Sequence, residues 1–340
     1  MIKSSLTLDH KIILKNVNMP TIKNDEILLK ILSCAICGSD LKISQYGNDR
    51  IVEERTIGHE IAGEISLLGS EVKNYNIGDK VSIAADLPCN ECLYCESGKV
   101  NLCHKNLAIG YQFDGGFTQY MVLNKFILKN GPIQKFFNIT PDEACLAEPL
   151  ACAINGVKKS IQCFSSEKIN NALIYGGGPI GLLIAEYLFY KNIKDIVIVE
   201  PNITRLNFIN NNTEFKCISN SSDTNTNFDL VFTACSVLDT HHDSLKKINK
   251  SGVINFFGGL PKNSKNLSLS SNEIHYKEIV ILGTHGSTPN LHKLALTLLE
   301  NKEIILDYII TDKFPLEDIN RAFIKAKSGE SLKIIINPNE

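Results

Sequence analysis

The most constraining feature of this sequence is a run of glycines between two apolar segments. The stretch Gly176-Gly177-Gly178-Pro179-Ile180-Gly181 fits the pattern G-x-G-x-x-G, with the apolar run Ala172–Tyr175 before it and the helical spacing of Ile180–Tyr190 after it. Glycines at such a turn let the backbone approach a pyrophosphate at the N-terminus of the helix. Glu200 ends the next apolar run, where an acid can accept hydrogen bonds from the adenosine ribose. The pattern predicts a Rossmann dinucleotide-binding unit with these residues at the cofactor.

The acid at position 200 also bears on which dinucleotide is bound. A carboxylate there would repel a 2′-phosphate, so we expect NAD rather than NADP. Arg205 follows five residues later and could hold that phosphate, which keeps NADP as the less favoured cofactor. The alternative is a glycine turn in an α/β domain without a cofactor, and the presence of strand, helix and acid together argues against it.

The rest of the chain separates into an alternating part and a β-rich part. Apolar runs at 196–200, 228–233, 253–257 and 279–282 alternate with helical spacing, notably at Leu238–Ile248, which predicts an α/β fold with a doubly wound parallel sheet. The tract Asn210–Asn227 is expected to be a surface loop around one weak strand. The first ~145 residues contain short runs at 26–32, 61–67 and 80–84 that predict a barrel-like β unit. Near the end, helices are expected at 290–301 and 315–327, and a strand at 332–336.

Composition sets broad limits on function. The chain has 340 residues, enough for two domains. With 35 basic and 37 acidic residues the net charge is −2, which lacks the basic excess of a nucleic-acid binder. The N-terminus has no signal-peptide pattern, and the apolar stretch Ala172–Tyr190 is interrupted by glycines and Pro179. We therefore expect a cytoplasmic protein without a membrane segment, whose eleven cysteines do not form disulfides.

Four of these cysteines lie close together. Cys89, Cys92, Cys95 and Cys103 supply soft ligands within one loop, which favours a closed tetrahedral zinc site of the structural kind. An iron–sulfur cluster is the alternative, but its four-cysteine pattern ends with a spacing of three and a proline, and here seven residues precede the last cysteine. His104 is expected to be a surface residue, since four thiolates already complete the zinc shell.

A second set of ligand types is scattered. Cys37, His59, Glu60 and Glu148 offer thiolate, imidazole and carboxylate groups, which suit a zinc ion with one position left for water or substrate. From spacing alone, each of these residues could equally be a packed core residue.

The motifs around these residues resemble the medium-chain zinc-dependent alcohol dehydrogenases, in the branch of sorbitol and other polyol dehydrogenases. They are Cys37-Gly-Ser-Asp, Gly58-His-Glu, Gly78-Asp-Lys-Val, the cysteine cluster, Gly115-Gly-Phe-Thr-Gln-Tyr, Glu148-Pro-Leu-Ala, the glycine turn and Phe314-Pro-Leu-Glu-Asp-Ile-Asn. The resemblance implies a GroES-like catalytic domain at 1–148 and 289–340 with two zinc ions per chain. It further implies a Rossmann NAD-binding domain at 149–288, an active site between the two, and a homodimer or homotetramer with Glu278–Leu282 as a pairing edge.

The resemblance also assigns roles to residues. It implies that Cys37 and His59 ligate the catalytic zinc, that Glu60 ligates it directly or stands behind it, and that Glu148 is the remaining ligand or binds through water. Asp40 would orient His59, and Ser39 would be the proton relay. Zinc would stabilise an alkoxide whose carbon passes a hydride to the nicotinamide, and that ring would be bordered by the backbone of Gly258, Gly259 and Leu260.

Three further positions leave alternatives open. Many relatives carry His where this chain has Lys42, which could end the relay, bind substrate or lie solvated on the surface, the reading we favour. His285 lies in the loop that the resemblance places near the substrate, although contact is the less favoured reading. His241 and His242 are expected to be solvated on a surface helix.

Three functions are compatible with these features. The first is oxidation of a polyol or sugar alcohol by NAD, with a small alcohol or ketone as substrate; Glu148 favours it because simple-alcohol enzymes often place Cys there. The second is a dehydrogenase of another secondary alcohol, such as threonine or an aminocyclitol. The third is a non-catalytic NAD-binding redox sensor, which the joint presence of Cys37, Ser39, His59 and Glu60 disfavours.

Overall fold

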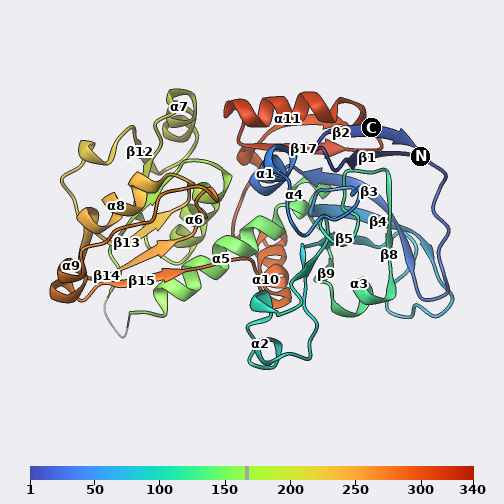
Figure 1. Ribbon diagram of the computed structural model, residues 1–340, viewed down its shortest axis with the longest axis horizontal. Coiled ribbons are helices and arrows are strands. Elements are labelled where there is room, and N and C mark those ends of the chain that lie inside the picture. Colours follow the sequence, from blue (N-terminus) through green and yellow to red (C-terminus); the bar gives the residue numbers. More distant parts are fainter. Residues whose placement is uncertain (165–167) are drawn as a thin grey trace. The chain divides into compact units, whose positions relative to one another are not determined.

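The computed structural model describes residues 1–164 and 168–340. The chain divides into two compact units, which we describe separately (Figure 1). Unit 1 consists of Met1–Ala151 and Gly286–Glu340, and unit 2 consists of Cys152–His285. Unit 2 is therefore one continuous segment, whereas unit 1 is completed only when the chain returns to it.

Unit 1 is built on a mainly antiparallel sheet. In hydrogen-bonding order, its strands are β16 (Ile310–Pro315), β17 (Lys333–Asn337), β3 (Ile27–Ala35), β4 (Glu60–Leu68), β5 (Lys80–Ile83) and β9 (Ile133–Lys135), and β8 (Tyr120–Leu123) also pairs with β3. Two small sheets pair β1 (Ile2–Leu6) with β2 (Ile12–Asn16), and β6 (Asp86–Leu87) with β7 (Leu107–Ala108). The pairing of β3 with β4 shifts register twice, and such bulges bend a sheet. The predicted β-rich unit of short strands is confirmed.

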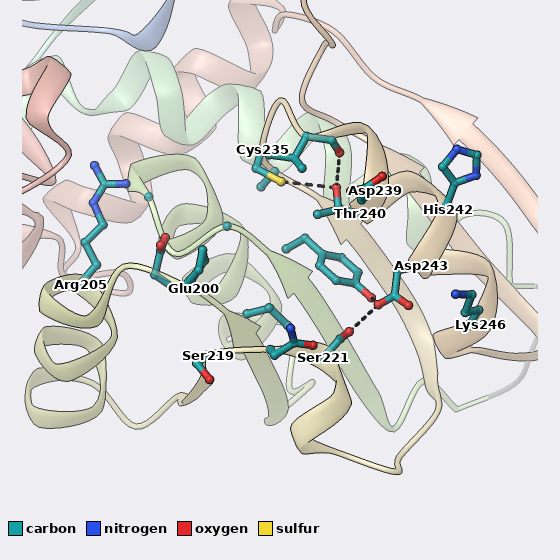
Figure 2. Close-up of a pocket in the computed structure, with 18 residues that line it drawn as sticks. Glu200, Arg205, Ser219, Ser221, Cys235, Asp239, Thr240, His242, Asp243 and Lys246 are labelled. Atoms are coloured by element: carbon teal, nitrogen blue, oxygen red, sulfur yellow. Dashed lines mark hydrogen bonds between the residues drawn. The ribbon is translucent and has the colours of Figure 1, made fainter. Parts of the chain in front are cut away.

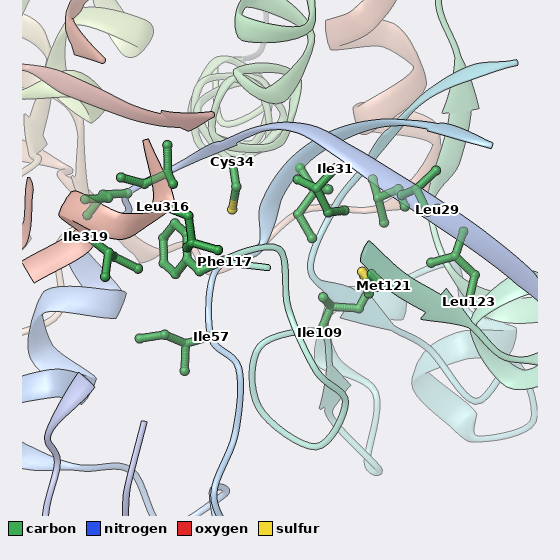
Figure 3. Packing of buried hydrophobic residues seen from close by; sticks show 14 of the residues in the cluster. Leu29, Ile31, Cys34, Ile57, Ile109, Phe117, Met121, Leu123, Leu316 and Ile319 are labelled. Atoms are coloured by element: carbon green, nitrogen blue, oxygen red, sulfur yellow. The ribbon is translucent and has the colours of Figure 1, made fainter. Parts of the chain in front are cut away.

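The core of unit 1 joins the two ends of the chain. Figure 3 shows Leu29 and Ile31 of β3 near Met121 and Leu123 of β8, with Phe117 beside residues of the last segment. Those residues, Leu316 and Ile319, are fully buried. Burial of this apolar surface is the main force that holds the C-terminal segment in unit 1.

Several helices join these strands. They are α1 (Gly38–Tyr46), α2 (Leu93–Glu96), α3 (Lys125–Asn130), α4 (Pro141–Cys145), α10 (Pro289–Glu300) and α11 (Ile319–Ser328), with short 3-10 turns at Val100–Leu102, Asp307–Ile309 and Leu316–Asp318. The helix α5 (Ala147–Ile161) begins in unit 1 and continues into unit 2. The helix α11 ends at Gly329, whose φ of 76° is left-handed. The sequence did not predict α1 or α5.

Unit 2 contains an all-parallel sheet. Its described strands follow the order β12 (Lys216–Ile218), β11 (Asp195–Val199), β10 (Asn171–Tyr175), β13 (Phe228–Thr233), β14 (Ile248–Phe256) and β15 (Val280–Gly283). They alternate with α6 (Pro179–Tyr190), α7 (Ile203–Asn212), α8 (Leu238–Lys247) and α9 (Ser271–Lys277), and a 3-10 turn lies at Ser221–Asp223. The strand order reverses between β10 and β13, as in a doubly wound sheet, so the predicted fold is confirmed. Ligands of such sheets bind at the carboxyl ends of the strands near that reversal.

The prediction for His241 in unit 2 is wrong. His241 is not solvated: only 4% of it is exposed, and its ring stacks on Phe256 with centroids 4.4 Å apart. The reason is that α8 packs on β13 and β14, so His241 lies on the inner side of that helix. The predicted weak strand within Asn210–Asn227 is confirmed as β12.

No helix in the described ranges 1–164 and 168–340 is both long and apolar enough to cross a membrane. The apolar stretch Ala172–Tyr190, which could be mistaken for a membrane segment, is divided into strand β10, the glycine turn and helix α6.

Candidate active site

The glycine turn joins β10 to α6 in unit 2. Gly176 has a φ of 104°, a backbone conformation that residues other than glycine rarely adopt. A Cβ on Gly181 would lie 1.9 Å from the Gly176 carbonyl oxygen, so only glycine permits this approach of helix to turn. Gly178 is the N-cap of α6 and Pro179 occupies its first turn, which leaves backbone N–H groups at the helix start free to face an anion.

A cavity of about 780 Å³ lies against this turn (Figure 2). Of the residues predicted to bind the cofactor, Gly176, Gly178, Glu200 and Arg205 line it. Pro179, Ile180 and Gly181 belong to the helix behind the turn. Gly258, Gly259 and Leu260 follow β14 and are not among its described lining residues.

Glu200 is buried beside the turn. Its carboxylate accepts hydrogen bonds from the backbone N–H groups of Gly177 at 3.0 Å and Asn202 at 2.9 Å. These bonds fix its orientation, and each carboxylate oxygen keeps a further lone pair for another donor. The predicted acid is thus held at the cavity wall, ready to accept a hydrogen bond from a ligand hydroxyl.

The four clustered cysteines converge in unit 1. Their sulfur atoms lie within 4.8 Å of one another; those of Cys92 and Cys95 are 3.6 Å apart. Backbone N–H groups, chiefly those of His104 and Cys95, lower the pKa of Cys92 to about 6, while burial raises that of Cys95 to about 12. Four thiolates at this spacing fit a tetrahedral zinc ion. His104 is outside the group: its side chain is exposed and its ring lies 5.0 Å from that of Tyr94.

A second group of potential ligands forms where β3 and β4 run side by side. Cys37 follows the end of β3 and is the N-cap of α1, while Glu60 begins β4 and pairs with Ala35. The ligand atoms of Cys37, His59 and Glu60 lie within 4.8 Å of one another. His59 is 5% exposed and Glu60 is fully buried. Three of the four scattered residues are therefore brought together by adjacent strands.

Asp40 positions two of these ligands. Its Oδ2 accepts the Cys37 backbone N–H at 2.9 Å, and its Oδ1 lies 3.5 Å from His59 Nδ1. That separation is long for a hydrogen bond, yet neither atom has another partner among the described residues. Burial works to lower the pKa of His59, but the charges of Asp40 and Cys37 outweigh it and raise that pKa well above its usual value. Nδ1 thus faces Asp40, and Nε2 is left for a metal, with the Ser39 hydroxyl 3.3 Å away.

Glu148 is near this cluster but not part of it. It lies in the first turn of α5, is 7% exposed, and is absent from the group of three. Burial raises the pKa of its carboxyl to about 7; the charge of His59 lowers it and that of Glu60 raises it further. Whether Glu148 acts directly or through water stays a prediction.

Lys333 is a site residue that the sequence analysis missed. It is 3% exposed in β17, and its Nζ donates to both carboxylate oxygens of Glu60 at 2.8 Å. Burial acts to lower the pKa of Lys333, but the charge of Glu60 more than compensates and raises it. The only available signal was a lysine inside the otherwise apolar run Leu332–Ile336.

An aromatic side chain lies next to His59 and was also missed. The Tyr111 ring is 6.2 Å from the His59 ring, and the Arg50 guanidinium lies 4.5 Å above Tyr111. Burial raises the pKa of the Tyr111 hydroxyl. Two other predicted positions are exposed: Lys42 on α1 and His285, whose carbonyl accepts the Asn155 amide.

Comparison with known proteins agrees with this geometry. Residues 23–130 match the model of the alcohol dehydrogenase GroES-like domain, and residues 141–337 match the glucose dehydrogenase C-terminus. The chain is 29% identical over 336 residues to D-arabinitol dehydrogenase 1 of Uromyces fabae, covering 95% of this chain and 93% of that protein. It is 26% identical over 348 residues to L-threonine 3-dehydrogenase of Yersinia pestis, covering 98% of each.

A solved structure shows the same fold. A dehydrogenase from Sinorhizobium meliloti, assigned as zinc-binding and solved with NADP, superposes with a TM-score of 0.88 at 23% identity, covering 99% of each chain. The predicted combination of a GroES-like domain with a Rossmann sheet is therefore confirmed. Because the family models together span most of the sequence, this chain is a member of the medium-chain zinc-dependent alcohol dehydrogenase family.

Proposed function

We propose that this enzyme passes a hydride between a polyol or sugar alcohol and NAD, with zinc at the group formed by Cys37, His59 and Glu60. The observation that carries the proposal is the convergence of thiol, imidazole and carboxylate within 4.8 Å, with Ser39 and Asp40 already bonded or aligned to His59. These donors fit zinc in kind and spacing. Zinc held there supplies a Lewis acid for the oxygen of the substrate.

The residues of the chain divide the remaining work. Asp40 faces His59 Nδ1 and so keeps Nε2 directed at the metal position. Ser39, with its hydroxyl 3.3 Å from that nitrogen, is suited to take the proton that the alcohol loses and pass it outward. Lys333 neutralises Glu60. Of the three converging ligands, only Cys37 would then bring an uncompensated negative charge, so a divalent ion held by these three alone would keep a net positive charge toward substrate.

The proposal assigns NAD to unit 2. Glu200, at the wall of the 780 Å³ cavity, would accept hydrogen bonds from the ribose hydroxyls and repel a 2′-phosphate. Residues 149–288 would form the NAD-binding domain, with Gly258, Gly259 and Leu260 bordering the nicotinamide. Residues 1–148 and 289–340 would form the catalytic domain.

A polyol is the substrate class best supported. The similarity to a D-arabinitol dehydrogenase and the carboxylate at position 148 both favour it. Threonine is the second candidate, because the similarity to an L-threonine 3-dehydrogenase covers as much of the chain. Membership of an enzyme family removes the support for a non-catalytic redox sensor.

Three measurements test the proposal. Metal analysis of the purified enzyme should find two zinc ions per chain, as two ligand groups require. A panel of polyols, sugar alcohols and threonine, followed by the absorbance of the reduced nicotinamide with NAD and with NADP, should give activity on polyols with NAD. Activity on threonine alone would show that the substrate is an amino acid and not a polyol. Preference for NADP would overturn the proposal that Glu200 excludes a 2′-phosphate. Light scattering would check the proposed homodimer or homotetramer.

A further inference from the structure

A partly buried carboxylate in unit 2 is held by two hydroxyl groups. The Tyr175 hydroxyl, at the end of β10, donates to Asp243 Oδ2 at 2.6 Å, and the Ser221 hydroxyl donates to the same oxygen (Figure 2). Asp243 itself lies on α8. Three separate elements therefore fix the orientation of this one side chain.

The two hydrogen bonds use only one of the two carboxylate oxygens. In the described part of the chain, no donor reaches Asp243 Oδ1, and no lysine, arginine or histidine forms an ion pair with this residue. A carboxylate in such a place retains unused acceptor capacity. This Oδ1 oxygen is not among the buried unpaired atoms of the described residues, so water or a ligand in the cavity can supply its donor.

Asp243 shares its cavity with the proposed cofactor site. Tyr175, Ser221 and Asp243 line the same 780 Å³ space as Gly176 and Glu200. If the pyrophosphate lies at the glycine turn and the ribose at Glu200, the purine base lies farther from the turn, beyond the ribose. The lining there combines apolar side chains, Val199 and Val237, with the polar group of Ser221 and Asp243.

We propose that Asp243 recognises the base of the dinucleotide, with Oδ1 accepting a hydrogen bond from the exocyclic amino group of adenine. Adenine presents a donor at that position, whereas hypoxanthine and guanine present a carbonyl oxygen, which the carboxylate would repel. Tyr175 and Ser221 are positioning residues that hold Asp243 toward the base. This inference rests on the proposed binding of NAD in unit 2.

The test compares two dinucleotides whose purines differ at position 6, where hypoxanthine has a carbonyl oxygen in place of the amino group and a proton on the adjacent N1. Isothermal titration calorimetry on the zinc-loaded enzyme measures the Kd of NAD and of nicotinamide hypoxanthine dinucleotide. Hydrogen bonds to charged groups are worth enough to change Kd about tenfold or more. We expect the wild-type enzyme to bind NAD tighter by at least about that factor.

The informative variant is Asp243→Asn, which keeps the shape and an acceptor for Tyr175. Its amide can donate to the carbonyl oxygen of hypoxanthine, so the preference for NAD should fall to about onefold or reverse. Asp195→Asn is the matched control, because Asp195 is an exposed acid of unit 2 at the start of β11 and is not among the described residues that line the cavity. It should leave the preference unchanged. Tyr175→Phe should reduce the preference partly, by releasing the carboxylate.

The outcomes separate the two proposals. Equal binding of both dinucleotides by the wild type, or an equal weakening of both in Asp243→Asn, would overturn base recognition and leave NAD binding intact. Failure of the wild type to bind either dinucleotide would overturn the proposed cofactor and base recognition with it. The ratio of the two Kd values remains informative if Asp243→Asn is less stable, because a purely structural loss would weaken the binding of both dinucleotides equally.

Discussion

The two groups of potential zinc ligands in unit 1 are built in opposite ways. The cysteine cluster takes all its ligands from the segment between Cys89 and Cys103, and only Cys103 among them is buried. The group of Cys37, His59 and Glu60 draws on separate strands, and its histidine and carboxylate are buried. Local loops shape the first, whereas the whole sheet shapes the second.

The difference extends to the charges around each group. Beside the cysteine cluster, Lys105 pairs with Glu91 on the surface, where both side chains are more than half exposed. Beside the second group, Lys333 pairs with Glu60 almost without exposure. Once one charge of such a pair is buried, the opposite charge is needed beside it, because a single buried charge destabilises the folded protein. We therefore expect the protein to position the second group by itself, and the cysteine cluster to depend on a bound metal.

The largest effect is expected when one cysteine of each group is replaced and the two variants are compared. Cys37→Ser should lower kcat/KM by about a thousandfold or more, since even residues behind a metal ligand typically cost 10- to 100-fold, and should leave the thermal unfolding midpoint nearly unchanged. Cys95→Ser should do the reverse: a lower midpoint, with activity per folded molecule retained.

Steady-state kinetics, zinc analysis and thermal unfolding on both variants decide this. If Cys37→Ser kept hydride transfer, the catalytic assignment would fail. If Cys95→Ser abolished activity in folded protein, the separation between a structural and a catalytic group would be lost.

The next effect tests the buried pair. In the zinc-free protein, Lys333→Met leaves Glu60 as a buried carboxylate without a cation, which should cost about 3–5 kcal/mol of unfolding free energy. The double variant with Glu60→Gln should recover much of that loss, since no charge is then stranded. Urea unfolding measures both, and a single variant as stable as the wild type would show that the pair does not hold β17 to β4.

Removal of metal should affect the two groups unequally. A chelator should open the segment around Cys89–Cys103, because four thiols on a loop have little else to hold them. The unfolding midpoint would fall by about 2–4 °C for each kcal/mol of metal binding lost. Hydrogen exchange should quicken there while β3 and β4 stay protected. Equal loss of protection in both regions would contradict the idea that the second group is preformed.

The smallest effect is expected at the surface ion pair. Lys105→Met should leave the unfolding midpoint unchanged within error, because exposed pairs in water contribute little. Lys105→Met is the matched control for Lys333→Met, because both variants replace a lysine that pairs with a glutamate by the same residue. A loss as large as that of Lys333→Met would mean that burial does not decide the value of these pairs.

Sequence reasoning succeeded where the information is local. The strand Phe228–Thr233 has the bounds predicted, because an apolar run between polar residues marks a buried parallel strand. The start of β14 was missed: the strand begins at Ile248 rather than Val253, through a register shift and a left-handed Ser251 that no apolar pattern reveals. His241 was misjudged because a polar residue can lie on the inner side of a helix.

The candidate site could be predicted only in part, because some of its contacts join residues that are far apart in the sequence. The cysteine cluster can be predicted from spacing, since its ligands are neighbours in the chain. The pair of Glu60 and Lys333 joins residues 273 positions apart, and such contacts leave no pattern in one sequence. Family resemblance supplied the scattered ligands, but it did not supply the lysine that neutralises one of them.

The strand β17 has a consequence for how the protein is made. It pairs with β3 at Cys34 and Ala35, just before Cys37, and it carries the cation for Glu60, yet the ribosome produces it after all of unit 2. The continuous unit 2 can fold during translation, while that end of β3 stays an open edge. Unpaired strand edges invite association with other chains, so a translation arrest before residue 333 would release an aggregation-prone polypeptide. The cation that pairs with Glu60 is thus supplied by a strand synthesised 273 residues after that acid.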